Sequence, residues 1–150
     1  MEYLAQFGEN RVLWTAVVAW FVAQVLKIVF VFIQDRRINL KRFVGSGGMP
    51  SSHSSFSVSL AMAVGFVEGF NSVEFAICFC FAIIVMYDAA GVRRSAGQQA
   101  QVLNRMLEKW EDGNFKDTDK ELKELLGHTP VEVFAGAVLG FVIALISFVL

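Results

Sequence analysis

The chain has 150 residues, of which 55% are hydrophobic, and its formal net charge is −1. This composition excludes a typical soluble domain with a polar shell, and the near-neutral charge gives no indication of nucleic acid or of an acidic partner. The sequence therefore predicts a compact integral membrane protein that forms a single domain, 1–150.

Long apolar runs divide the chain. The first residues carry Glu2 and Glu9 rather than a basic leader, so we expect the first run to remain as a membrane anchor. The expected fold is an all-α bundle of about four membrane-spanning helices. The third run continues past Ala90 with no proline to stop it, which predicts one long helix that leaves the membrane. The expected spans are 12–33, 56–70, 73–90 and 131–150, with loops at 34–55 and 91–130.

The positions of the basic residues predict the orientation. All lysines and arginines except Arg11 and Lys27 lie in those two loops. Because basic loops stay on the cytoplasmic side, we expect both loops in the cytoplasm and both termini outside. The expectation that follows is a plasma membrane protein whose polar clusters meet at the cytoplasmic boundary.

One of these clusters is the glycine- and serine-rich stretch 45–55, which contains Gly48, Ser51, Ser52 and His53. Glycines let the backbone approach a ligand closely, and a serine before an apolar run favours the start of a helix. The free N–H groups of a helix start attract anions. The stretch predicts a phosphate site at a membrane surface, although the glycines would equally let the connector turn back into the membrane.

The second cluster precedes the last apolar run. Thr129, Pro130 and Glu132 fit a capping box, which accounts for Glu132 structurally. A carboxylate one turn after His128 would also hold the imidazole in one orientation, as in a nucleophile-activating set. The sequence does not separate these two roles. His128 and His53 are the only histidines, and each lies at the entrance to an expected span.

Charged residues at the membrane edge form the third group. Arg93 and Arg94 would either snorkel to the headgroups or bind a phosphoryl group with their guanidinium forks. Lys27 lies about 10 Å inside the first span at the helical rise, where an ammonium must snorkel or line a polar cavity. Asp88 is expected to pair with Lys27 or with an arginine. The glycine pairs 65/69 and 136/140 have the spacing that lets helices pack closely.

Several of these motifs resemble the type 2 phosphatidic acid phosphatase and vanadium haloperoxidase superfamily, and most closely its divergent membrane branch. The resemblance covers most of the chain in order. The matching elements are Gln24-x-x-Lys27, Gly-Gly-Met-Pro-Ser-Ser-His-Ser, Tyr87-Asp88-Ala-Ala-Gly-Val-Arg93-Arg94, Leu103-Asn104 and Gly127-His-Thr-Pro-Val-Glu-Val.

The resemblance implies hydrolysis of a phosphate ester without a metal or other cofactor. His128 would attack phosphorus and form a phosphohistidine, Glu132 would orient it, and His53 would protonate the leaving oxygen. The phosphoryl oxygens would be held by residues from all three clusters, with three further residues in support. The holding residues are Ser51, Ser52, Gly48, Arg93, Arg94 and Lys27, and the supporting residues are Asp88, Arg37 and Arg42.

The chain also departs from the superfamily pattern. Leu122 stands where the family has an arginine six residues before the nucleophilic histidine, and either Arg93 or Arg94 would replace that arginine. Ser52 stands for a glycine and Glu132 for an aspartate. Four spans, against the six usual in the membrane enzymes of the family, leave room for a homodimer.

The expected function is therefore a metal-independent phosphatase that hydrolyses a lipid phosphate monoester or pyrophosphate. The substrate class would be phosphatidic acid, phosphatidylglycerol phosphate or a polyprenyl phosphate, with its tail in the membrane. The alternative is a non-catalytic membrane protein that binds anionic lipid or phosphate at its basic cytoplasmic face. Transport is a weaker third interpretation, because the sequence gives no continuous polar lining.

Overall fold

The computed structural model describes residues 2–35, 48–110 and 127–150. These residues form helices and no strand, as the expected all-α fold class requires. The expected loops 34–55 and 91–130 fall partly outside the described residues, and Arg37 and Arg42 lie there. The helices are α1 (Glu2–Glu9), α2 (Arg11–Asp35), α3 (Ser52–Glu68), α4 (Val73–Ala90), α5 (Val92–Trp110) and α6 (Pro130–Phe148).

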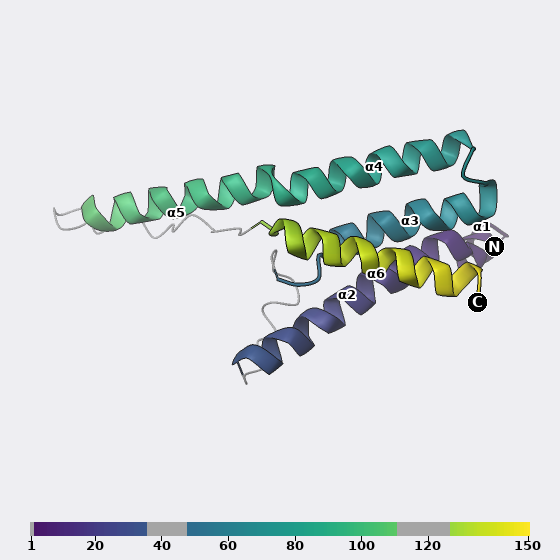
Figure 1. The fold of residues 1–150 in the computed structure, drawn as a ribbon, viewed down its shortest axis with the longest axis horizontal. Coiled ribbons are helices and arrows are strands. Elements are labelled where there is room, and N and C mark those ends of the chain that lie inside the picture. Colours follow the sequence, from purple (N-terminus) through teal and green to yellow (C-terminus); the bar gives the residue numbers. More distant parts are fainter. Residues whose placement is uncertain (1, 36–47, 111–126) are drawn as a thin grey trace.

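Four helices form one bundle. Figure 1 shows α2, α3, α4 and α6 side by side, and α3 packs against each of the other three. Both chain termini lie at one end of this bundle (Figure 1). Toward the other end α2 finishes, α3 and α6 begin, and α5 extends beyond them. The starts of α3 and α6, which carry the two histidines, are therefore at the same end.

Three of the four expected spans are long and apolar enough to cross a membrane: Arg11–Ile33, Pro130–Phe148 and Val73–Met106, which includes the expected 73–90. The expected span at 56–70 is not among them. It belongs to α3, which has 17 residues and a length of about 25 Å, shorter than a typical hydrocarbon core. α3 is instead the central helix of the bundle, and most of its serines are buried between its neighbours.

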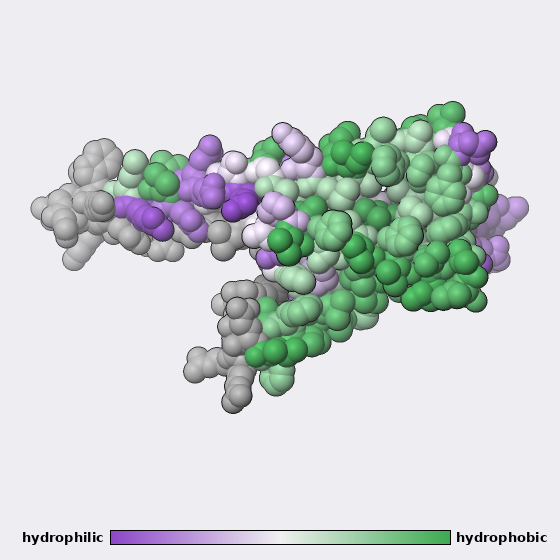
Figure 2. Space-filling model, viewed as in Figure 1, coloured by the Kyte–Doolittle hydropathy of each residue, from purple (hydrophilic) through white to green (hydrophobic). Residues whose placement is uncertain are grey.

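The surface agrees with this division. Figure 2 shows apolar residues over the bundle, whereas hydrophilic residues gather on the visible face of α5.

α4 and α5 nearly continue one another in Figure 1, as expected of a long helix that leaves the membrane. The helix is interrupted at Gly91, whose ψ of −82 departs from helical geometry. The expected continuous helix is therefore two helices with a break between them.

α3, α4 and α6 begin at polar caps. Ser51 is the N-cap of α3, and its hydroxyl accepts a hydrogen bond from the Ser54 N–H at 3.4 Å. Thr129 caps α6, and the predicted capping box with Glu132 is confirmed. α3 ends at Gly69, whose φ of +93 lies in the region that favours glycine.

The contact between α3 and α6 is very close. A Cβ added at Gly136 would overlap the carbonyl oxygen of Ser51, and one added at Gly140 would overlap that of Ser55. The close-packing prediction for this pair is confirmed. In the other predicted pair, Gly65 makes room for the ring of Phe70 and for that of Phe75 in α4, whereas Gly69 is the C-cap of α3.

Small side chains fill the space that such close helices leave. The buried hydrophobic residues of the described chain are alanines apart from Val133, and the buried polar residues are mainly serines of α3. Serine hydroxyls of α3 also reach backbone carbonyls of α2: Ser55 Oγ donates to Ala19 O at 3.1 Å, and Ser59 Oγ donates to Thr15 O at 3.4 Å. The bundle is held by backbone proximity and interhelical hydrogen bonds, as in other membrane helices.

The α3–α6 contact predicts that Gly136→Ala destabilises the protein by about 1–3 kcal/mol, because the added methyl group meets backbone that cannot rotate away. The midpoint of thermal unfolding in detergent measures this effect. Gly8→Ala is the matched control, since a Cβ at Gly8 meets nothing within 4 Å. Equal midpoints for the two variants would show that α6 does not depend on this approach.

Candidate functional site

The starts of α3 and α6 are joined through the backbone. The Ser51 N–H donates to the carbonyl oxygen of Glu132 at 2.9 Å, and the His128 N–H donates to that of Ala89 at 3.0 Å. The second bond ties the residue before the α6 cap to the last turn of α4. Three helix ends are thereby fixed around one place, and the predicted clusters at 48–55 and 127–132 meet there.

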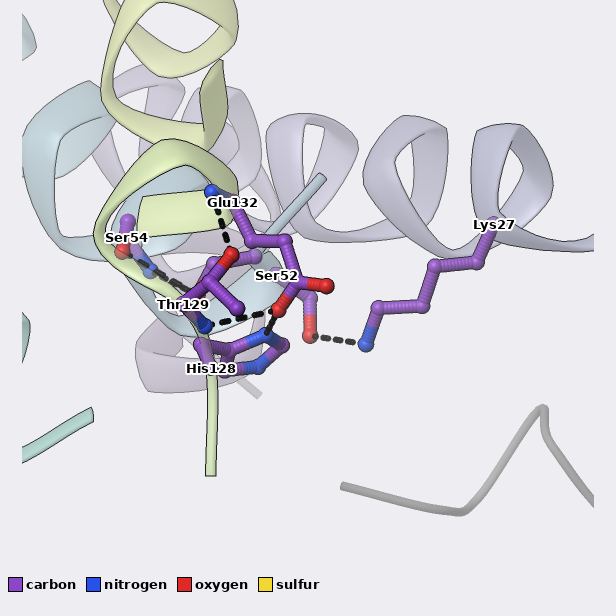
Figure 3. Close-up of polar contacts among 7 residues, drawn as sticks. Lys27, Ser52, Ser54, His128, Thr129 and Glu132 are labelled. Carbon is purple, nitrogen blue, oxygen red and sulfur yellow. Dashed lines mark hydrogen bonds and ion pairs between the residues drawn. The ribbon is translucent and has the colours of Figure 1, made fainter. Parts of the chain in front are cut away.

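Glu132 serves both of the roles that the sequence left open. Its Oε2 accepts the backbone N–H of Thr129 at 3.0 Å, and the same oxygen lies 3.2 Å from Nδ1 of His128. The Glu132 N–H in turn donates to the Thr129 hydroxyl at 3.3 Å. Figure 3 shows this carboxylate between the cap and the imidazole. The capping box therefore fixes the carboxylate that orients His128.

The orientation of His128 leaves one ring nitrogen unused. With the carboxylate as acceptor at Nδ1, the neutral ring carries its proton there and has its lone pair on Nε2. Only 3% of the His128 surface is exposed, and Nε2 has no hydrogen-bond partner among the described residues. A buried acceptor nitrogen without a partner is unusual in proteins and is the arrangement that a nucleophile needs.

The surroundings of His128 favour its neutral form. Burial lowers the pKa of His128 from 6.5, and the nearby ammonium of Lys27 lowers it further. The carboxylate of Glu132 and the backbone of Gly48 act in the opposite direction. The Gly48 backbone is near enough to the ring to raise its pKa, although Nε2 has no hydrogen bond of normal geometry to a described residue. Burial is the largest influence, and it favours the neutral ring.

His53 lies beside His128. The centroids of the two rings are 6.2 Å apart, and their planes meet at 64°. The two residues are far apart in the sequence. His53 is exposed, whereas His128 is buried. At this separation both rings can reach a single phosphoryl group.

Lys27 points into the same place. Only 4% of its surface is exposed, and Nζ lies 3.4 Å from the hydroxyl of Ser52, to which it donates. Figure 3 shows the side chain reaching from α2 toward Ser52 and the imidazole of His128. Of the two alternatives for this residue, lining a polar site describes its position and snorkelling to the surface does not.

Ser51 and Gly48 have mainly structural positions. The Ser51 hydroxyl is engaged by the N–H and the hydroxyl of Ser54, the latter at 3.1 Å, and its own N–H is bonded to Glu132. It is a helix cap rather than an open phosphate ligand. Gly48 has a φ of +87, which only glycine adopts without strain, so it shapes the entry to the cap.

Three further predicted residues belong to α4 and α5. Arg94 is exposed on α5, and the side chain of Arg93 lies outside the described part of the structure. Asp88 is half-buried in the last turn of α4. The roles proposed for these three residues stay predictions. Within the described ranges no group of three His, Cys, Asp or Glu side chains could hold a metal ion.

Sequence reasoning missed two contributors to the site. The carbonyl of Ala89 positions His128, and no side-chain signal could have indicated a backbone acceptor. Ser54 was one of several serines in the stretch, and its contact with Ser51 depends on which serine caps α3. Because the N-cap directly precedes the first helical residue, the contact between Ser54 and Ser51 could be predicted only if the first residue of α3 were known.

These features define an integral membrane protein with a paired-histidine site. The chain belongs to the Divergent PAP2 family, whose model matches residues 8–143. It is 39% identical over 156 residues to a Bacillus subtilis (strain 168) protein named "Uncharacterized membrane protein YuiD", an alignment that covers 97% of this chain and 96% of that protein. No solved structure matches the chain.

The lowered pKa of His128 predicts a loss of stability in mild acid. Above a pH of about 6.5 the ring is neutral in both the folded and the unfolded chain and contributes nothing. As the pH falls below that value, the unfolded chain binds a proton that the folded chain does not. The free energy of unfolding therefore decreases until the pH passes the folded-state pKa.

Unfolding midpoints in detergent at a pH of about 7.5 and about 5.5 measure this decrease. His128→Gln is the control, because it removes the titrating group and keeps a polar side chain of related size. Its midpoint should fall less than that of the unmodified protein. The same fall in both proteins would assign the acid sensitivity to other groups.

Proposed function

We propose that the chain is a membrane phosphatase that hydrolyses a lipid phosphate monoester or pyrophosphate through a phosphohistidine. The observation that carries the proposal is the buried His128, whose Nδ1 lies 3.2 Å from Glu132 and whose Nε2 has no hydrogen-bond partner among the described residues. His53 and Lys27 beside it supply a proton donor and a positive charge. Membership of the Divergent PAP2 family supports the same chemistry.

The reaction proceeds in two transfers. In the first, the Nε2 lone pair of His128 attacks phosphorus while the bond from phosphorus to the leaving oxygen breaks. Protonated His53 gives its proton to that oxygen, and the dephosphorylated lipid leaves. In the second, water attacks the phosphohistidine, its proton passes to His53, and the phosphorus–nitrogen bond breaks. Inorganic phosphate is released, and both histidines return to their starting states.

Lys27 and Glu132 support these steps by charge. The ammonium of Lys27 stabilises the negative charge on the phosphoryl oxygens, and Ser52 beside it is placed to donate a further hydrogen bond. The carboxylate of Glu132 stabilises the positive charge that His128 gains when its nitrogen bonds to phosphorus. Because Oε2 is also bound to the Thr129 N–H, the carboxylate does not have to reorient during the reaction.

The position of the site suits a lipid substrate. It lies at the end of α4 and the start of α6, both of which belong to segments apolar enough to span a membrane. A headgroup can therefore reach the site while the tail stays among lipids. The basic residues between the spans support a cytoplasmic location for this end. Phosphatidic acid, phosphatidylglycerol phosphate and a polyprenyl phosphate all have this form.

Leaving-group dependence separates the roles of the two histidines. We expect His128→Ala to abolish phosphate release from both phosphatidic acid and 4-nitrophenyl phosphate. His53→Ala should slow the lipid reaction by about 10²–10⁴-fold, the usual contribution of a general acid. It should slow the nitrophenyl ester much less, because that leaving group needs no proton. Phosphate release by the purified protein in detergent measures both effects.

Glu132→Gln is the matched variant for the orienting carboxylate. The amide oxygen can still accept the Thr129 N–H, so the helix cap is retained while the charge is lost. Activity should fall although the unfolding midpoint changes little.

Unchanged turnover in His128→Ala would refute the mechanism. Binding of phosphatidic acid vesicles without turnover would favour the non-catalytic, anion-binding alternative.

Metal removal should leave the activity unchanged. The proposed steps use only His128, His53 and Lys27 as nucleophile, acid and cation. We therefore expect equal rates of phosphate release before and after dialysis against a chelator, and no gain when Mg²⁺ or Zn²⁺ is added. A rate that falls with chelator and returns with one of these ions would require a metal in the mechanism.

A further inference from the structure

The short helix α1 has one apolar face and one polar face. Tyr3, Leu4 and Phe7 lie together on one side, and 85%, 78% and 55% of their respective surfaces are exposed. Glu2, Gln6 and Glu9 lie on the opposite side at helical spacing. Three large, exposed apolar side chains on a helix of eight residues would be costly to leave in water.

Contacts with α2 fix the place of α1. Asn10 lies between the end of α1 and the start of α2. Its side chain accepts the Leu13 N–H at 3.0 Å and so caps α2. The Trp14 indole donates to the Phe7 carbonyl at 3.2 Å, and the Phe7 and Trp14 rings meet edge to face at 6.0 Å between centroids. α1 is therefore a helix that packs against α2, and it was not expected from the sequence.

The neighbouring residues place α1 at the level of a membrane boundary. Arg11 donates to the carbonyl oxygen of Ser147, at the end of the span formed by α6, and its guanidinium lies 4.7 Å from the centre of the Phe148 ring. A cation at this position and a part-exposed Trp14 one turn further along are typical of the membrane–water interface. This is also the end of the bundle where both termini lie (Figure 1).

We propose that α1 lies in the lipid–water interface at this end of the protein, with its apolar face among the acyl chains. The occupant of that face is phospholipid, because the face joins the lipid-facing surface of α2 through the contact of Phe7 with Trp14. The side chains of Tyr3, Leu4 and Phe7 enter the boundary between headgroups and acyl chains by about 5–10 Å, and the acidic face remains in water. Because that face is acidic, insertion does not depend on anionic lipid.

Site-directed spin labels in the full chain test the proposal. In a background with Cys78→Ala and Cys80→Ala, single labels are placed at Leu4→Cys and, as the matched control on the opposite face, at Gln6→Cys. Val138→Cys serves as the lipid reference and Gln98→Cys as the water reference, since both positions are exposed. The protein is reconstituted in phosphatidylcholine vesicles, and collision rates with oxygen and with a water-soluble nickel chelate are measured.

The label at position 4 should resemble the lipid reference, with oxygen collisions several-fold more favoured over nickel collisions than at position 6. The label at position 6 should resemble the water reference. Adding Leu4→Glu to a Tyr3→Cys variant should move the label at position 3 toward water. Equal nickel access at positions 4 and 6 would overturn the proposal. Protection of position 4 from both reagents, with broadening between labels, would overturn it in favour of a contact between two copies.

Discussion

The approach of α6 to the backbone of α3 is the constraint on which the site depends. At Gly136 and Gly140 a side chain as small as a methyl group would overlap a carbonyl oxygen of α3. This approach brings the first turns of both helices close enough for the Ser51 N–H to bond to the Glu132 carbonyl. The 6.2 Å separation of the two imidazoles follows from that spacing. Glycines more than one helical turn from His128 thus determine its geometry.

In the first turn of α6, one carboxylate serves two purposes. A helix start needs acceptors for its free N–H groups, and a reactive histidine needs a carboxylate to fix its tautomer. Glu132 meets both requirements with one oxygen, because the cap residue Thr129 follows His128 directly. The stability of the helix start and the orientation of the imidazole are therefore coupled through one side chain.

Much of this arrangement could be predicted from the sequence. The capping box of α6, the glycine pair that packs it, and the meeting of His53 with His128 all follow from residue type, spacing and the common end of the spans. These features depend on local chemistry, or on successive apolar helices running in opposite directions so that alternate connections lie at the same end. The depth of Lys27 in an apolar run left snorkelling and a polar site as alternatives, and its burial in the structure favours the polar site.

Other features could not be predicted in this way. Ser52 and Ser51 are equally good caps by residue type, and only the exact start of α3 decides between them. The apolar content of 56–70 suggested a span, but the serines on one side of it mark a helix enclosed by others, which depends on tertiary contacts. The break at Gly91 and the place of Arg94 depend on backbone geometry that a pattern of residue types does not contain.

A core made of alanine, serine and glycine also has limited capacity to adapt. Such side chains lose little conformational entropy on burial, so helices can associate without large apolar groups between them. They also have few alternative rotamers, and a misfit at Ala19, Ala23 or Ala63 cannot be absorbed by neighbours that turn aside. The interior of the bundle should tolerate very few sequence changes, whereas the lipid-facing aromatic and branched residues can be exchanged freely for one another.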